Sequence, residues 1–267
     1  MAKFPGADAS SETADYVIVG APLDVSTTFR PGARFGPDRI RKFARPFDEY
    51  DHRTDRHFSD LVTDSGNVAA WDDTAEYLRF LEGQLTDHHA ADRLPLLLGG
   101  EHTVTIAGVR STEPDVYVSL DAHLDLYEAY AGNELSHATV THHALETARE
   151  AVLLGVRSGS EDEWDRASEA DVTVVSPEEI TEWSPEFDDE DVYLSVDIDA
   201  VDPGFAPGTG TPAPFGLEPR ELRDVVRAVA PNAVGFDIVE VNDRDDGQAA
   251  ALGGKVLQEF VFAHADR

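Results

Sequence analysis

Histidine and carboxylate residues gather in three short motifs of this sequence: GGEH at 99–102, DAHLD at 121–125 and DID at 197–199. The motifs supply His102, Asp121, His123, Asp125, Asp197 and Asp199. Burying four carboxylates together is costly unless cations compensate their charge. Imidazole and carboxylate ligands without thiolate suit Mn²⁺, Mg²⁺ or Zn²⁺, and the chain contains no cysteine. Six such side chains are enough for two ions ~3.5–4 Å apart with bridging carboxylates.

Each motif, taken alone, also has an explanation that requires no metal ion. An isolated Asp-X-Asp is more often a solvated pair or a helix cap, and GGEH carries little weight by itself. A fourth segment, AVGFDI at 233–238, is followed closely by Glu240. Four apolar runs that each lead into acidic or histidine residues favour one shared metal centre.

The apolar runs indicate how these residues are positioned. Strands are predicted at 16–20, 94–98, 116–120, 152–155, 172–175, 192–196 and 233–238. Continuous apolar runs are typical of strands buried on both faces of a parallel sheet. Helices are predicted between them, at 37–44, 73–89, 103–110, 138–149, 161–167, 219–229 and 248–263. This alternation indicates an α/β sheet covered by helices on both faces.

Ligands of open α/β sheets bind beyond the carboxyl ends of the strands, which is where the motifs fall. Residues i, i+2 and i+4 of a strand share one face. Asp121, His123 and Asp125 would therefore project together if their strand continued through the motif. Asp197 and Asp199 would do the same on another strand.

The sequence also resembles the ureohydrolase family of arginases, agmatinases, guanidinobutyrases and formimidoylglutamases. The resemblance covers nearly the whole chain in order, and the segment at 195–217, SVDIDAVDPGFAPGTGTPAPFGL, is its most specific part. The other segments are GAPLD at 20–24, RPGARFGPDRIR at 30–41, GGEH, DAHLD, SHAT at 136–139 and DIVEVND at 237–243. Glu101 departs from the aspartate that is frequent in the family, and Asp243 from its proline, but neither position is a family ligand.

The resemblance implies a three-layer αβα fold with a mostly parallel sheet of about eight strands, in a single domain over 1–267. It implies two Mn²⁺ per subunit, with other divalent ions as alternatives. By position, His102 and Asp125 would bind one ion, His123 and Asp199 the other, and Asp121 and Asp197 would bridge them. Glu240 matches the glutamate that pairs with the substrate guanidinium, and His137 a histidine that assists proton transfer or positioning. Asp125 would carry the proton to the leaving amine.

The implied reaction is hydrolysis of agmatine to putrescine and urea by hydroxide held between the two ions, a step in polyamine metabolism. The segment at 127–139, YEAYAGNELSHAT, resembles the archaeal-type agmatinase pattern and lacks the arginase loop for α-amino and α-carboxylate groups. Guanidinobutyrase, formimidoylglutamase and arginase activities remain alternatives. A single-zinc deacetylase or an inactive binding or assembly subunit is disfavoured because all six ligands and Glu240 are present.

Some residue roles stay open at the sequence level. Glu128 or Glu134 would suit the ammonium group of agmatine, unless they are solvated loop charges. Arg30 and Arg34 would suit an anionic substrate, unless they form structural ion pairs. The Gly- and Pro-rich segment 204–214 is interpreted as a rigid wall beside the metals rather than a plain connection.

The amino-acid composition limits the classes of molecule that the protein is expected to bind. The 53 acidic and 21 basic residues give a net charge of −32. This charge disfavours nucleic acid and anionic membranes as partners. The small cation expected as substrate follows from the resemblance. Its even spread along a lysine-poor chain favours a halophilic, salt-adapted surface over attraction of a cationic substrate. With no secretory leader or membrane span evident, we expect a cytoplasmic protein. A homo-oligomer, trimer or hexamer, follows from the family analogy.

Overall fold

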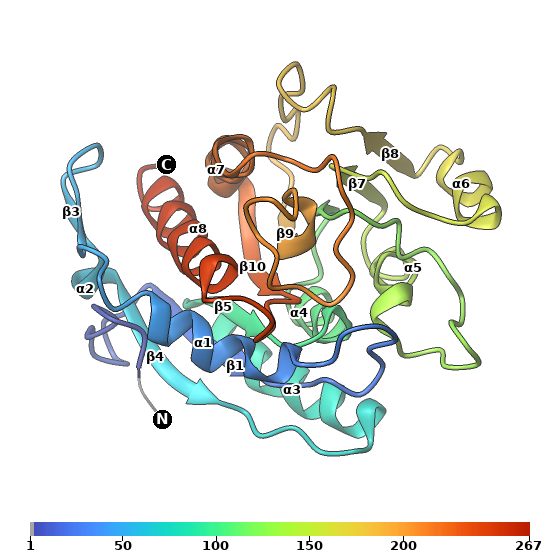
Figure 1. Ribbon diagram of the computed structural model, residues 1–267. Coiled ribbons are helices and arrows are strands. Elements are labelled where there is room, and N and C mark those ends of the chain that lie inside the picture. The colour runs from blue at the N-terminus through green and yellow to red at the C-terminus, as the bar shows by residue number, and fades with distance from the viewer. Residues whose placement is uncertain (1–2) are drawn as a thin grey trace.

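A sheet of eight parallel strands forms the centre of the computed structural model, which describes residues 3–267. The strand order is β4-β1-β5-β10-β9-β6-β7-β8 (Figure 1). The strands are β1 (Tyr16–Ala21), β4 (Val62–Asn67), β5 (Leu94–Gly99), β6 (Val116–Leu120), β7 (Glu150–Leu154), β8 (Val172–Val175), β9 (Val192–Asp197) and β10 (Ala233–Val239). A separate hairpin joins β2 (Tyr50–Asp51) to β3 (Arg56–His57). All seven predicted strands are present, each within two residues of its predicted bounds.

Helices cover both faces of the sheet. Helices α1 (Gly36–Phe43), α7 (Pro219–Val229) and α8 (Gln248–His264) pack together on one face, and α2 (Phe58–Leu61) joins them. Helices α3 (Thr74–His89), α4 (Thr105–Thr112) and α5 (Val140–Ala144) cover the other face, with α6 (Glu161–Ala167) beside β8. This arrangement confirms the three-layer αβα fold (Figure 1). No helix in residues 3–267 is long and apolar enough to span a membrane.

The sequence analysis missed the edge strand β4. Its sequence, VTDSGN, has no apolar side chain after Val62 and includes a glycine. Because β4 pairs only with β1, it does not need apolar side chains on both faces. Its Asp64 instead accepts hydrogen bonds from Arg41 of α1, Nε to Oδ2 at 2.8 Å and a terminal nitrogen to Oδ1 at 2.9 Å. Both side chains are fully buried, so this ion pair fixes α1 to the sheet edge.

The predicted helix at 138–149 is wrong in its length. The chain forms a 3₁₀ turn at His137–Thr139 and then α5, which ends at Ala144. From there the backbone tightens: Glu146 N donates to His143 O, and Thr147 N donates to Ala144 O. Arg149 N then donates to Asp115 O, at the entry of β7 beside β6. Because β7 begins at Glu150, soon after α5, the helix ends before the end of the segment whose sequence pattern predicts a helix.

Candidate metal centre

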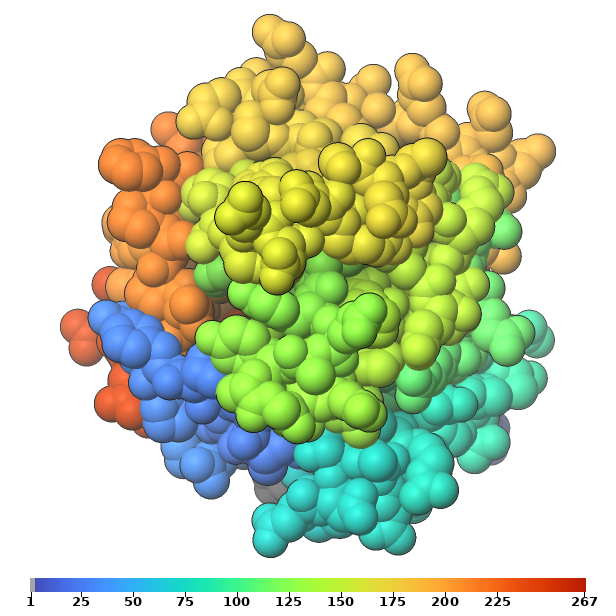
Figure 2. Space-filling model, turned by 90° about the vertical axis from the view of Figure 1, so that its right-hand side faces the viewer, coloured from blue at the N-terminus to red at the C-terminus, as the bar shows by residue number. Residues whose placement is uncertain are grey.

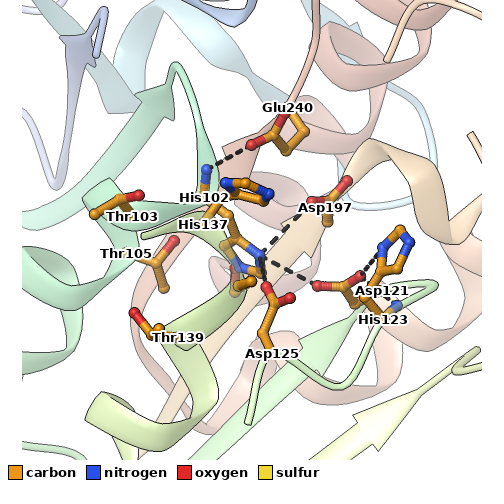
Figure 3. A network of polar contacts seen from close by, with 12 residues as sticks. His102, Thr103, Thr105, Asp121, His123, Asp125, His137, Thr139, Asp197 and Glu240 are labelled. Atoms are coloured by element: carbon orange, nitrogen blue, oxygen red, sulfur yellow. Dashed lines mark hydrogen bonds and ion pairs between the residues drawn. The ribbon is translucent and has the colours of Figure 1, made fainter. Parts of the chain in front are cut away.

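The predicted site residues meet at the carboxyl ends of four neighbouring strands, β5, β10, β9 and β6. His102 follows β5, Asp121 follows β6, and Asp197 is the last residue of β9. Glu240 follows β10 directly. Adjacent parallel strands end at one edge of the sheet, so residues far apart in sequence converge there (Figure 3).

The local backbone differs from the predicted extension of the strands. Strand β6 ends at Leu120, and Asp125 has φ +52° in the loop that follows. Asp199 lies in a 3₁₀ turn at Ile198–Ala200, where its N–H donates to Asp197 Oδ1 at 2.8 Å. The carboxylates therefore converge through tight turns and not through a shared strand face. A non-glycine residue at positive φ is strained, and such strain is frequent at functional sites.

His102 directs one ring nitrogen into a group of carboxylates. Its Nδ1 lies 3.0 Å from Asp125 Oδ2, 3.2 Å from Asp121 Oδ2 and 3.6 Å from Asp197 Oδ2 (Figure 3). This Nδ1 is buried and has no hydrogen-bond partner. A lone pair surrounded by carboxylates is stabilised by a cation, so this nitrogen is a candidate metal ligand.

A hydrogen-bond chain behind His102 determines its tautomer. Its Nε2 lies 3.0 Å from Ser195 Oγ, and that hydroxyl donates to Asp237 Oδ1 at 2.7 Å. The hydroxyls of Tyr193 and Thr105 donate to Asp237 as well. Since the Ser195 hydrogen points to Asp237, its oxygen accepts from His102 Nε2–H, which leaves Nδ1 unprotonated and free to bind a metal.

His123 forms a second group of the same kind. Its Nδ1 lies 3.1 Å from Asp199 Oδ2 and 3.5 Å from Asp121 Oδ1. Asp121 thus offers one carboxylate oxygen to each histidine. In each of the sets His102–Asp121–Asp197 and Asp121–His123–Asp199, the ligand atoms lie within 4.8 Å of one another. The two sets share Asp121, which is the arrangement required of a bridging ligand.

The electrostatics of the cluster also favour cations. Burial raises the pKa of Asp125 to about 7, and the Asp121 charge adds to this effect. Burial and the neighbouring Asp199 raise the pKa of Asp197 well above its usual range. Burial opposes a charge on His123, yet the Asp199 carboxylate raises its pKa above the usual value. Without metal, the cluster retains protons as its compensating charge, and divalent cations would replace them.

Glu240 lies beside this cluster in a strained position. Its φ is +60°, and its Oε1 accepts a hydrogen bond from His102 N at 2.9 Å. Burial raises its pKa to about 8, against the effect of that hydrogen bond. The loop 204–214 passes close by, because a Cβ on Gly210 would lie 2.9 Å from Glu240 Oε2. Glycine at this point lets the loop approach the carboxylate, which supports the interpretation of the loop as a wall of the site.

A cavity of about 250 Å³ opens above these side chains. His102, His123, Asp125, Asp197, Asp199 and Glu240 line its floor, and Thr28, Tyr127, Tyr130, His137, Glu163 and Thr211 are among its other lining residues. Burial lowers the pKa of His137. Figure 2 shows the hollow where segments drawn in blue, green and orange meet. A cavity of this size accommodates a small linear molecule.

Comparisons with known proteins agree with this geometry. The Arginase family model matches residues 14–263. The chain belongs to the arginase family. It is 35% identical to an agmatinase of Bacillus cereus over 270 residues, which covers 95% of this chain and 93% of that one. It is 34% identical to the N(1)-aminopropylagmatine ureohydrolase of Thermococcus kodakarensis over 270 residues, with 95% and 92% covered.

A solved relative has the same fold as this arginase-family chain. The crystal structure of agmatine ureohydrolase of Thermoplasma volcanium superposes with a TM-score of 0.94 at 31% identity. The match covers 100% of this chain and 95% of that one. The family implies a metal centre with two ions, and the two sets of ligand atoms described above are the candidates for it.

Several residues with open roles lie outside the cavity of this arginase-family chain. Glu128 and Glu134 are exposed and do not line it. Arg34 lies 3.4 Å from Asp24, and the Arg30 guanidinium stacks over the Phe29 ring at 5.1 Å. The two arginines therefore have structural contacts, and the glutamates have the exposure of solvated loop charges.

Two residues that shape the cavity were not predicted from the sequence. Glu163 on α6 is a buried acid in its wall, and it forms a capping box with Ser160. Arg157 donates to the backbone carbonyls of Asp199 and Ala213, among others, and so joins the turn that carries Asp199 to the loop 204–214. Its only sequence signal was its place just after a predicted strand.

Proposed function

We propose that this arginase-family protein hydrolyses agmatine to putrescine and urea. The observation that carries the proposal is the unpartnered Nδ1 of His102 among three carboxylates, next to Glu240 in the same cavity. The agmatine-hydrolysing relatives of similar length support the choice of substrate.

The ligand roles follow the contacts. His102 and Asp125 would hold one ion, and His123 and Asp199 the other, because each pair lies within 3.1 Å. Asp121 would bridge through its two oxygens, and Asp197 is the proposed second bridge. The nitrogen and oxygen donors fit Mn²⁺, and the absence of cysteine removes thiolate ligands that favour zinc. Bound divalent cations would lower the pKa of water so that hydroxide is present at neutral pH.

The surrounding residues would then orient the substrate. The Glu240 carboxylate would pair with the guanidinium by charge-assisted hydrogen bonds, which fixes the central carbon over the cluster. Asp125, which lies beside His102 Nδ1 at 3.0 Å, would pass a proton to the leaving amine. His137, a cavity residue whose pKa is lowered by burial, would stay neutral and position the leaving group.

The far end of agmatine is an ammonium group, and Glu163 is the acid placed to receive it. Its carboxylate accepts from Ser160 N at 2.9 Å, Ser160 Oγ at 3.0 Å and Leu126 N at 3.3 Å. A carboxylate has about four acceptor positions, so one remains for an ammonium group. The rings of Tyr127 and Tyr130, 5.1 Å apart, would contact the aliphatic chain.

Other ureohydrolase substrates fit less well. No arginine or lysine lines the cavity among residues 3–267, so the carboxylate of arginine, guanidinobutyrate or formimidoylglutamate has no cationic partner there. An agmatine extended by an aminopropyl group is the second candidate, which the Thermococcus relative supports. That substrate keeps the guanidinium and carries more positive charge.

A homo-oligomer, trimer or hexamer, is proposed from the family analogy. A cytoplasmic location in a salt-rich cell stays a prediction that rests on the acidic, lysine-poor composition.

A substrate panel tests the proposal. Manganese-loaded protein in high salt would be incubated with agmatine, aminopropylagmatine, arginine, guanidinobutyrate and formimidoylglutamate, and urea or formamide measured. Urea released fastest from agmatine is expected. Turnover of none of the five would contradict a hydrolase function, and formamide release with inert agmatine would contradict the proposed substrate.

A further inference from the structure

Glu101 is a fully buried carboxylate that does not line the cavity. Its Oε2 accepts from Val25 N and Ser26 N, each at 2.7 Å. Its Oε1 accepts from Ser26 Oγ at 2.9 Å and from Thr103 Oγ1 at 2.8 Å. Four donors on one side chain bind the loop at 25–26 to the start of the 3₁₀ turn that carries His102.

Ser26 links this carboxylate to His137. Its Oγ accepts a hydrogen bond from His137 N at 3.0 Å and lies 3.1 Å from His137 Nδ1. A hydroxyl has one hydrogen to donate and two lone pairs to accept with. A carboxylate is the stronger acceptor for that hydrogen, so Ser26 donates to Glu101. Its second lone pair then accepts from His137, which requires a hydrogen on Nδ1.

Ser136 offers a second and longer contact to His137 Nδ1, and donation along it would favour the opposite tautomer. Ser136 Oγ lies 3.4 Å from His137 Nδ1, farther than Ser26, and it accepts from Ala138 N as the cap of its turn. Donation from Ser26 to His137 Nδ1 would be the alternative. In that case Glu101 Oε1 would accept only from the Thr103 hydroxyl, and the charge-assisted hydrogen bond from Ser26 to Glu101 would be lost.

We infer that Glu101 and Ser26 are positioning residues that hold neutral His137 as the Nδ1–H tautomer. The unprotonated Nε2 is then the ring nitrogen available to the cavity. His137 can therefore accept a hydrogen bond from a substrate N–H but cannot donate one in its neutral form. The catalytic value of this arrangement rests on the proposed function, whereas the tautomer itself does not.

The tautomer can be measured by NMR on protein labelled with ¹⁵N-histidine and loaded with diamagnetic Mg²⁺. Two-bond ¹⁵N–¹H correlations distinguish the two neutral tautomers, and the signal of His137 is the one missing in His137→Asn. We expect the Nδ1–H form in the unaltered chain at a pH above the His137 pKa. A predominant Nε2–H form there would overturn the inference without any activity assay.

Variants test the role of Ser26. Ser26→Ala removes one hydroxyl and keeps both backbone hydrogen bonds to Glu101, so His137 should shift toward the Nε2–H form. We expect kcat for agmatine to fall about tenfold, the effect of one lost hydrogen bond, with KM and bound metal unchanged. Thr27→Val is the matched control: it removes the neighbouring hydroxyl, which bonds only Asp24, and should leave tautomer and kcat unchanged.

Two outcomes separate the inference from the proposed function. An unchanged tautomer in Ser26→Ala, or an equal loss of kcat in Thr27→Val, would overturn the role of Ser26. A chain that has the Nδ1–H tautomer but releases no urea from agmatine would contradict the proposed function and still support the tautomer assignment.

Discussion

Replacing Glu163 by glutamine tests how the far end of the substrate is recognised. A hydrogen bond to a charged group contributes about 1.5–3 kcal/mol, so loss of the carboxylate should lower kcat/KM for agmatine about 10- to 100-fold. The variant also has a stability cost that the structure explains. Both carboxylate oxygens face donors, Ser160 N on one side and Leu126 N on the other. In either orientation of the amide, its NH₂ group faces a backbone N–H donor. The unpaired donors lower the free energy of unfolding by about 1–3 kcal/mol.

The assay uses two substrates to separate recognition from stability. Butylguanidine has the guanidinium of agmatine but no ammonium group, so Glu163→Gln should leave its kcat/KM nearly unchanged. Glu161→Gln is the matched control, because it removes an exposed charge from the first turn of the same helix. An equal loss for both substrates in Glu163→Gln would refute recognition of the ammonium group by Glu163. So would an equal loss for agmatine in the two variants.

Three further predictions concern the metal centre and the fold. Asp237→Asn weakens the chain that orients His102 through Ser195, so metal affinity measured by titration should fall about 10- to 100-fold; unchanged affinity would exclude this role. Burial raises the pKa values of Asp125 and Glu240 to about 7 and 8, and a raised carboxyl pKa gives stability at low pH that is lost as pH rises through it. The Tm gap between metal-loaded and chelator-treated protein should therefore widen from pH 6 to 8.5, and a constant gap would contradict it. Arg41→Met removes the guanidinium that neutralises the buried Asp64 carboxylate and should lower the free energy of unfolding by about 3–5 kcal/mol in denaturant titrations. Adding Asp64→Leu should recover only part of that loss, because Phe4 N and Gly66 N then lose their acceptor, and an unchanged stability of Arg41→Met would contradict the role of this ion pair.

The positions of the ligands could be predicted from sequence because apolar runs locate strand ends, and parallel strands end at one edge. That rule alone predicts that His102, Asp121 and Asp197 lie at the same edge of the sheet. The way they converge could not be predicted, since it depends on the positive φ of Asp125 and on a 3₁₀ turn at Asp199. Edge strand β4 was missed because Asp64 serves a buried ion pair, which breaks the apolar pattern that marks central strands.

The wall of the cavity was the least predictable part. Glu163 reaches it from a helix far along the chain, and its local sequence indicates only a helix cap. Glu128 and Glu134 were nearer in sequence to the ligands but point outside the cavity lining. Proximity in sequence is thus a poor guide to which loop charges meet the substrate, because loop conformation decides it.

The most direct test of the central claim is urea release during metal titration. Chelator-treated protein in high salt would be titrated with Mn²⁺ in the presence of agmatine, while bound manganese and urea are measured together. We expect no urea from metal-free protein, and a rate that reaches its maximum at about two bound ions per chain, as for a two-metal site. Replacement of Asp197 by alanine should lower both bound manganese and urea release. Full urea release from metal-free protein, or from the Asp197→Ala variant, would contradict the account.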